Sequence, residues 1–193
     1  MNSDKIKNNL IKLSHSVVVS ALSSFYLYLP NIITKNLIFF TSGIYFINDT
    51  KNVLKCEIID YPIIYHHIAA LLLLIAFYID YYELALIYVY NAVEISNISM
   101  YITYHLIQTN SSKNLILYSN ILQTFMYGYF RIYITTDYII KNNHLLYTPL
   151  SMLAGIYIIG WVWFSELCKQ LYTERLTIKY LVIDTYDRLL QNV

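Results

Sequence analysis

Long apolar segments follow one another along this chain of 193 residues, and few charges interrupt them. Six can be drawn, over residues 13–29, 32–48, 61–79, 83–107, 115–140 and 146–168. Because a helix needs about 20 mainly apolar residues to cross a bilayer, these lengths suit membrane spans better than core helices. The pattern predicts an all-α, polytopic membrane protein with a bundle of about six transmembrane helices.

The composition favours the same class of protein. Hydrophobic residues make up 58% of the chain and charged residues 13%, whereas about a quarter of a soluble domain is charged. The 4 Gly and 3 Pro leave little room for the turns of a β-barrel, and the alternation typical of barrel strands is missing. A net charge of +1 gives no basic surface, so nucleic acid is not an expected partner.

The basic residues predict an orientation, because Lys and Arg are enriched in cytoplasmic loops. On one side of the drawn spans lie Lys5, Lys7, Lys12, Lys51, Lys55, Lys113, Lys169, Arg175, Lys179 and Arg188. On the other side lie only Lys35 and Lys141, and Arg131 falls inside the fifth span. We therefore expect residues 1–12 and the tail, residues 169–193, to face the cytoplasm.

Two features near the ends allow alternatives. The first span could be a cleaved signal peptide, but its small residues lie inside the apolar run rather than after it, which favours retention. The tail places Leu171, Ile178, Val182 and Leu189 at helical spacing, which is typical of a short amphipathic helix on the membrane surface or of an ordinary solvated tail.

Pro30 and Asn31 predict a tight hairpin between the first two spans, since Pro ends one helix and can begin another. Cys56 and Cys168 form no motif and fall on the same predicted membrane face, so we expect two reduced thiols.

Ionisable residues inside a span are costly and usually face a partner or a cavity. Here they are Asp49, the pair His66-His67, Glu94 and Arg131. Glu94 lies roughly 16 Å and Arg131 roughly 13 Å from the outer ends of their spans. Since they share a depth and carry opposite charges, we expect them to face each other or to share a polar cavity.

Helical spacing extends this idea to two polar stripes. The fourth span carries Asn91, Glu94, Tyr101 and His105, and the fifth carries Asn120, Gln123, Tyr127 and Arg131. One interpretation is a bundle held together by hydrogen bonds and one ion pair. The other is a cavity lined by functional polar groups: Asp49, Asn91, Glu94, Tyr101, Gln123, Tyr127 and Arg131.

His66 and His67 point about 100° apart on a helix, so they do not readily share one metal ion. No metal site and no cofactor is indicated. An acid–base role beside Asp49 is chemically reasonable, because His titrates near neutral pH. A histidine pair satisfied by hydrogen bonds is the alternative.

Four sequence blocks occur in a fixed order: GIYFINDT (43–50), IIYHHIAAL (63–71), NAVEIS (91–96) and YFRI (129–132). Together they resemble the TLC domain shared by translocation-associated membrane proteins, ceramide synthases and CLN8-type proteins. The resemblance covers about residues 35–168. It implies a six-helix bundle around a lipid-sized cavity, in the endoplasmic reticulum or another internal membrane. Abundant Tyr, Ile, Asn and Lys are typical of AT-rich genomes such as those of some protists and large DNA viruses.

The resemblance also implies roles for single residues. His66 and His67 match the histidine pair of ceramide synthases, which is associated with acyl transfer from acyl-CoA; Asp49, Glu94 and Arg131 match polar positions of the broader domain. The aspartates that follow the pair in a synthase are missing between residues 88 and 104. This chain is therefore more similar to the smaller members that bind, sense or transport a membrane lipid. An acyl-CoA-dependent acyltransferase, and a structural or trafficking protein, are the alternatives.

Overall fold

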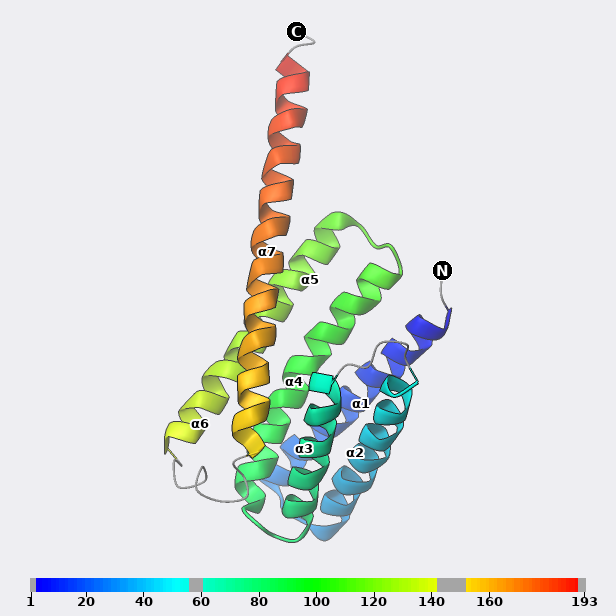
Figure 1. Ribbon diagram of the computed structural model, residues 1–193, viewed down its shortest axis with the longest axis vertical. Helices are drawn as coiled ribbons and strands as arrows, with labels where there is room; N and C mark the ends of the chain where they lie inside the picture. Colours follow the sequence, from blue (N-terminus) through cyan, green and yellow to red (C-terminus); the bar gives the residue numbers. More distant parts are fainter. Residues whose placement is uncertain (1–2, 56–60, 142–151, 191–193) are drawn as a thin grey trace.

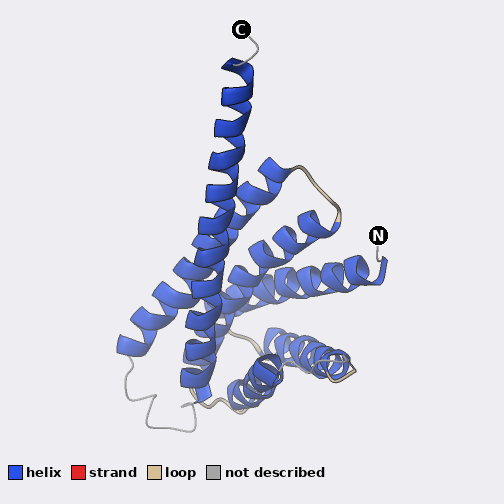
Figure 2. Cartoon of the chain, turned by 45° about the horizontal axis from the view of Figure 1, so that its top comes forward, coloured by secondary structure: helices blue, strands red, loops and turns tan. Residues whose placement is uncertain are grey.

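Helices account for nearly all of the chain that the computed structural model describes, which comprises residues 3–55, 61–141 and 152–190, with side chains over 6–55, 61–141 and 154–173 (Figures 1 and 2). Within these ranges no strand occurs. The elements are α1 (Ser3–Tyr28), α2 (Ile32–Val53), α3 (Tyr61–Tyr78), α4 (Glu83–Gln108), α5 (Lys113–Met126), η1 (Tyr127–Ile134), α6 (Thr135–Lys141) and α7 (Met152–Leu190). The all-α prediction is confirmed.

The elements α5, η1 and α6 follow one another without interruption and form the single fifth helix that the sequence predicts. Counted in this way, the described residues form six helices, as expected. The π-helical stretch η1 was not expected, and it contains Arg131. Short π-helical insertions within α-helices are frequent at functional sites.

The first hairpin forms where Pro30 and Asn31 predict it. Asn31 is the N-cap of α2, and its side-chain oxygen accepts a hydrogen bond of 2.9 Å from the backbone N–H of Thr34. Such a cap satisfies one of the donors left free at a helix start.

Asn110, with φ of 52°, lies just past the C-terminal end of α4. There an asparagine takes the left-handed conformation that often ends a helix.

Both ends of the bundle differ from the expected boundaries. Helix α1 begins at Ser3, so most of residues 1–12 is helical. Helix α7 continues through Cys168 to Leu190 as one helix of 39 residues, so the described part of the tail is helical and continuous with the sixth span drawn from the sequence. No proline lies between residues 152 and 190 to stop it. Cys56, residues 146–151 and residues 191–193 lie outside the described residues.

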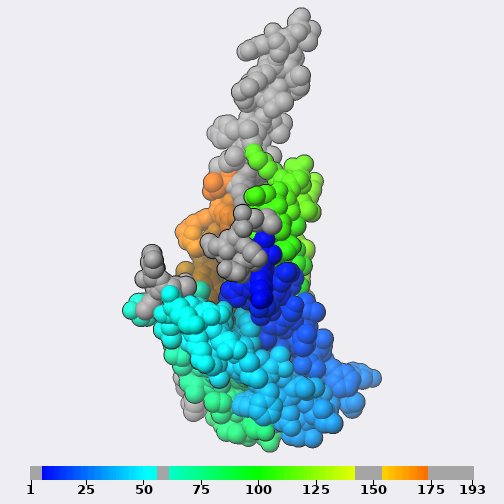
Figure 3. Space-filling view, turned by 90° about the vertical axis from the view of Figure 1, so that its right-hand side faces the viewer, coloured from blue at the N-terminus to red at the C-terminus, as the bar shows by residue number. Residues whose placement is uncertain are grey.

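The helices alternate in direction, so α1 begins and α7 ends toward the same end of the bundle (Figure 1). Helix α1 packs mainly against α4, and α2 packs against α3 and α1. In the space-filling view the first turns of α1 (dark blue) lie between the end of α2 (cyan) and the α4–α5 region (green) (Figure 3).

The opposite end of the bundle has an apolar interior. Buried side chains from four helices form one cluster there: Tyr26, Ile38, Leu74, Phe77, Leu86 and Ile87. Beside it Lys35 is 4% exposed and pairs with Asp80 and, at 3.3 Å, with Glu83. The hydrophobic cluster thus closes one end, and the cavity described below opens in the other half.

Two helical stretches in the described chain, Ile6–Tyr28 and Tyr61–Tyr78, are long and apolar enough to cross a membrane by length and composition alone. The core helix of a soluble protein, or a signal sequence near the N-terminus, satisfies the same criterion. Helix α4 is long enough but carries Asn91, Glu94 and Asn97 in its middle. The further prediction, six membrane spans, is considered under the proposed function.

Candidate functional site

A cavity of about 570 Å³ lies between α1, α2, α3, α4, the α5–η1 helix and α7. We call it the chamber. Its lining is rich in polar side chains: Asn8, Asn9, Lys12, Tyr45, Asp49, His66, His67, Glu94, Asn97, Tyr101, Tyr104, Gln108, Gln123, Tyr127, Arg131, Glu166 and Gln170. Polar groups are therefore gathered inside the bundle, contributed by every helix.

The chamber brings together nearly all of the residues that the sequence analysis proposed as catalytic or cavity-lining. It is lined by Asp49, His66, His67, Glu94, Tyr101, Gln123, Tyr127 and Arg131. Asn91 is the exception: its side chain donates a hydrogen bond of 3.2 Å to Ser24 of α1, outside the chamber lining. Asn91 lies at the edge of the polar stripe of α4, and α1 packs against that edge.

Asp49, at the end of α2, forms a polar group with α1 and α3. Its Oδ2 atom lies 2.8 Å from Nζ of Lys12 and 3.5 Å from Nε2 of His67. The other ring nitrogen of His67 lies 3.1 Å from the hydroxyl of Thr50. Asp49 and His67 therefore meet as expected, and Lys12 joins them.

His66 has a different environment from its neighbour. Its Nδ1 atom is buried and has no hydrogen-bond partner among the described residues. Its ring makes an edge contact with Trp163 of α7, with centroids 5.9 Å apart. The two histidine side chains thus lie in different surroundings, because adjacent residues on a helix point about 100° apart.

Glu94 and Arg131 share the chamber but do not touch directly. Asn97 lies between them: its amide accepts from Arg131 Nη2 at 2.7 Å and donates to Glu94 Oε2 at 3.3 Å. Glu94 Oε2 also accepts a hydrogen bond of 2.8 Å from Ser16. Of the two arrangements expected, a shared polar cavity is the one observed.

Sequence reasoning missed the contribution of α1. Asn9 donates a hydrogen bond of 2.9 Å to the backbone of Tyr101, and Ser16 and Lys12 contact the carboxylates of Glu94 and Asp49. The ring of His15 stacks on Tyr45 with centroids 3.7 Å apart. The helical spacing of Asn9, Lys12 and Ser16 was the available signal, but the basic residues at the start of the chain were used only to predict the orientation.

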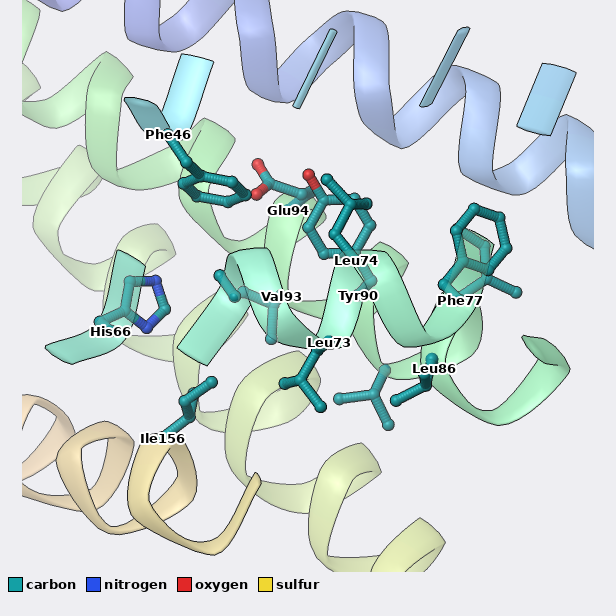
Figure 4. Close-up of a pocket in the computed structure, with 13 residues that line it drawn as sticks. Phe46, His66, Leu73, Leu74, Phe77, Leu86, Tyr90, Val93, Glu94 and Ile156 are labelled. Carbon is teal, nitrogen blue, oxygen red and sulfur yellow. The ribbon is translucent and has the colours of Figure 1, made fainter. Parts of the chain in front are cut away.

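A narrow apolar cavity of about 60 Å³, which we call the slot, adjoins the chamber. Phe46, His66 and Glu94 line both cavities. Figure 4 shows these three side chains toward one end of the slot, and Phe77 and Leu86 toward the other. The remaining lining is mainly apolar: Ala70, Leu73, Leu74, Ile87, Val89, Tyr90, Val93 and Ile156. Chamber and slot together make an amphipathic space.

In the part of the chain with described side chains, no three His, Cys, Asp or Glu residues cluster as a metal site would require. The charges of the chamber are paired or bridged by amides instead. The arrangement thus places a polar space of about 570 Å³ beside a small apolar one of about 60 Å³.

Comparison with protein-family models, with curated proteins and with solved structures gave no match for this chain.

Proposed function

We propose that this chain is a multi-pass membrane protein of the TLC type that binds a lipid inside its helix bundle. The observation that carries the proposal is the amphipathic space formed by chamber and slot. A lipid would place its headgroup among the polar groups of the chamber and its chain in the slot. Binding of this kind suits a protein that senses or transports a lipid and so influences membrane lipid composition.

The outer surface of the bundle supports a membrane location. Large apolar side chains are exposed on several helices, among them Phe40, Ile44, Ile47, Ile68, Leu72, Ile75, Tyr118, Leu122, Phe125, Ile158 and Val162. A soluble monomer rarely exposes more than a few hundred Å² of contiguous apolar surface. Apolar side chains outside and polar ones inside suit a bilayer, where polar groups turn toward the bundle interior.

The charges support an orientation with both termini in the cytoplasm. The two lysines expected at the outer end are each paired with carboxylates: Lys35 with Asp80 and Glu83, and Lys141 with Asp137 at 2.7 Å. The positive-inside rule counts Lys and Arg whether or not they are paired, so the orientation rests on ten basic residues at the other end against these two. The chamber then lies in the cytoplasmic half of the bundle.

The four sequence blocks that resemble the TLC domain support the family proposal through their positions. Each contributes a side chain to the chamber: Asp49 from the first, His66 and His67 from the second, Glu94 from the third and Arg131 from the fourth. Such a protein would reside in the endoplasmic reticulum or another internal membrane.

Lipid binding can be tested with a bulky substitution in the slot. Ala70→Phe would fill the slot, whereas Ala21→Phe adds the same ring on an exposed face of α1. Both variants and the wild type would be purified in mild detergent, and their lipids extracted and quantified by mass spectrometry. We expect stoichiometric lipid with the wild type and Ala21→Phe and little with Ala70→Phe. Equal amounts with all three proteins would refute binding in the slot.

An acyl-CoA-dependent acyltransferase is the second candidate, and the position of His66 favours it. Its unpartnered nitrogen lies where chamber and slot meet, which is where the bond between head and acyl chain would lie. A histidine there could act as a general base. Incubation with acyl-CoA and a long-chain amine would test this, with His66→Ala and His67→Ala as variants. Absence of a histidine-dependent product would exclude this candidate.

A further inference from the structure

Arg131 is a buried cation that contacts no carboxylate directly among the described residues; the nearest one identified, Glu94, is reached through Asn97. Arg131 is 7% exposed, and no carboxylate oxygen of the described residues lies within 4.0 Å of its guanidinium. Nη1 donates to the Tyr127 hydroxyl at 3.1 Å and Nη2 to the Asn97 amide. Nε is buried without a partner. The side chain therefore retains an unused donor and an incompletely balanced charge.

Two lysines inside the described bundle, the half-buried Lys12 and the buried Lys35, differ from Arg131. Lys12 contacts the carboxylate of Asp49, and Lys35 those of Asp80 and Glu83. Burying a charge is costly unless it is paired and hydrogen-bonded. By this comparison Arg131 lacks the directly contacting carboxylate that each of the two lysines has.

Arg131 lies near the mouth of the slot. Asn97 connects it to Glu94, which lines both the chamber and the slot. The guanidinium also lies over the Tyr127 ring, 4.7 Å from its centroid, which holds it in place. A headgroup bound by Arg131 would thus have its chain directed at the slot entrance.

The slot can admit no more than one chain. Its volume is about 60 Å³, compared with about 570 Å³ for the chamber. A cavity that holds one benzene measures about 150 Å³, so the apolar side chains of the slot must move apart as a chain enters. From His66 to Phe77 the slot follows α3 for about 16 Å. A lipid with two chains would have to leave one of them in the polar chamber or in the surrounding bilayer.

The carboxylates of the chamber are less suited to bind a cationic headgroup than Arg131 is to bind an anionic one, because their oxygens already have partners. Asp49 already contacts Lys12 and His67, and Glu94 accepts hydrogen bonds from Ser16 and Asn97. Arg131, in contrast, has a donor to spare, and arginine is well suited to bidentate binding of carboxylate and phosphate.

We propose that the ligand is a single-chain lipid with an anionic headgroup, a carboxylate or a phosphate, which Arg131 binds while the chain enters the slot. This proposal rests on the proposed function, because it names the class of lipid that the cavity holds.

A headgroup series would test it. The delipidated full-length protein in detergent would be titrated with hexadecanoate, monohexadecyl phosphate, hexadecanol and hexadecylamine, and binding followed by native mass spectrometry. We expect at least one anionic probe to bind roughly tenfold or more tightly than the alcohol and the amine. Whichever anion binds more tightly identifies the headgroup. Arg131→Gln should remove the preference, and Arg131→Lys should retain part of it.

The outcomes separate this proposal from the one on which it rests. If the alcohol or the amine binds as tightly as both anions, or Arg131→Gln leaves the preference unchanged, the anionic assignment is wrong. If in that case Ala70→Phe still abolishes binding, lipid binding in the slot stands. If no probe binds to the wild type, both proposals fail. Should Arg131→Gln not fold, the series on the wild type decides.

Discussion

Lys12 and Asp49, 37 residues apart in the sequence, bring Nζ and Oδ2 to within 2.8 Å and so join the start of α1 to the end of α2. Asp49 is 7% exposed and Lys12 24%. The carboxylate is therefore sheltered, while the ammonium keeps some contact with its surroundings.

Removing Lys12 should lower the free energy of unfolding by more than the loss of an exposed ion pair would, because Asp49 is buried. Lys12→Met leaves the Asp49 carboxylate buried with only His67 beside it, so we expect a loss of about 1–3 kcal/mol in the free energy of unfolding. In the double variant Lys12→Met/Asp49→Asn no carboxylate remains, and the loss should be smaller than the sum of the two single losses. Denaturant unfolding in detergent would measure all three. Additive losses would show that the pair does not interact.

The bridge through Asn97 predicts a coupling that depends on a third residue. Glu94→Gln and Arg131→Gln should show an interaction energy of about 0.5–2 kcal/mol in a double-mutant cycle, because both side chains hydrogen-bond to the same amide. The cycle repeated in an Asn97→Ala background should give a value near zero. An equal coupling with and without Asn97 would show a direct interaction between the two charges.

Close packing of α7 on η1 predicts different effects for two glycines. A Cβ at Gly128 would lie 2.8 Å from the ring of Phe164, whereas a Cβ at Gly43 would meet nothing within 4 Å. Both positions lie inside helices, so Gly→Val should change helix propensity equally. We expect Gly128→Val to be about 1–3 kcal/mol less stable than Gly43→Val because of overpacking. Thermal unfolding followed by tryptophan fluorescence would compare them, and Phe164→Ala should restore much of the loss.

The proposed orientation predicts which thiols a membrane-impermeant reagent can reach. Cys168 is exposed on α7, and Tyr81 is exposed between α3 and α4 at the opposite end. With Cys56→Ser as background, Cys168 should be labelled in microsomes only from the cytoplasmic side. Tyr81→Cys, made together with Cys168→Ser, should be labelled only after the membrane is permeabilised. The same labelling pattern for both thiols would contradict an odd number of crossings between them.

The helices and most of their ends could be predicted from local features. Apolar runs define α3 and α4 to within one residue, and Pro62 lies in the first turn of α3, where a proline is tolerated. Asn31 marks the start of α2. Helical spacing alone also placed Gln123, Tyr127 and Arg131 on one face, and all three line the chamber. The spacing argument succeeded there because the stripe repeats every four residues.

The same argument failed where a neighbouring helix decides the outcome. Asn91 belongs to the polar stripe of α4, yet it faces Ser24 because α1 covers that edge. The lysines of α1 served only to predict the orientation, since nothing local shows that Lys12 approaches Asp49. The π-helix at Arg131 likewise had no local signal: it lies within an otherwise regular helical pattern.

The sequence by itself determined an all-helical chain with polar groups placed inside apolar segments, because both properties depend on residues near one another along the chain. Only the tertiary structure decided that α1 supplies part of the chamber, that Asn97 separates Glu94 from Arg131, and that an apolar slot adjoins the polar space. Those features arise from contacts between helices, and the packing of one helix on another depends on side chains far apart in the sequence.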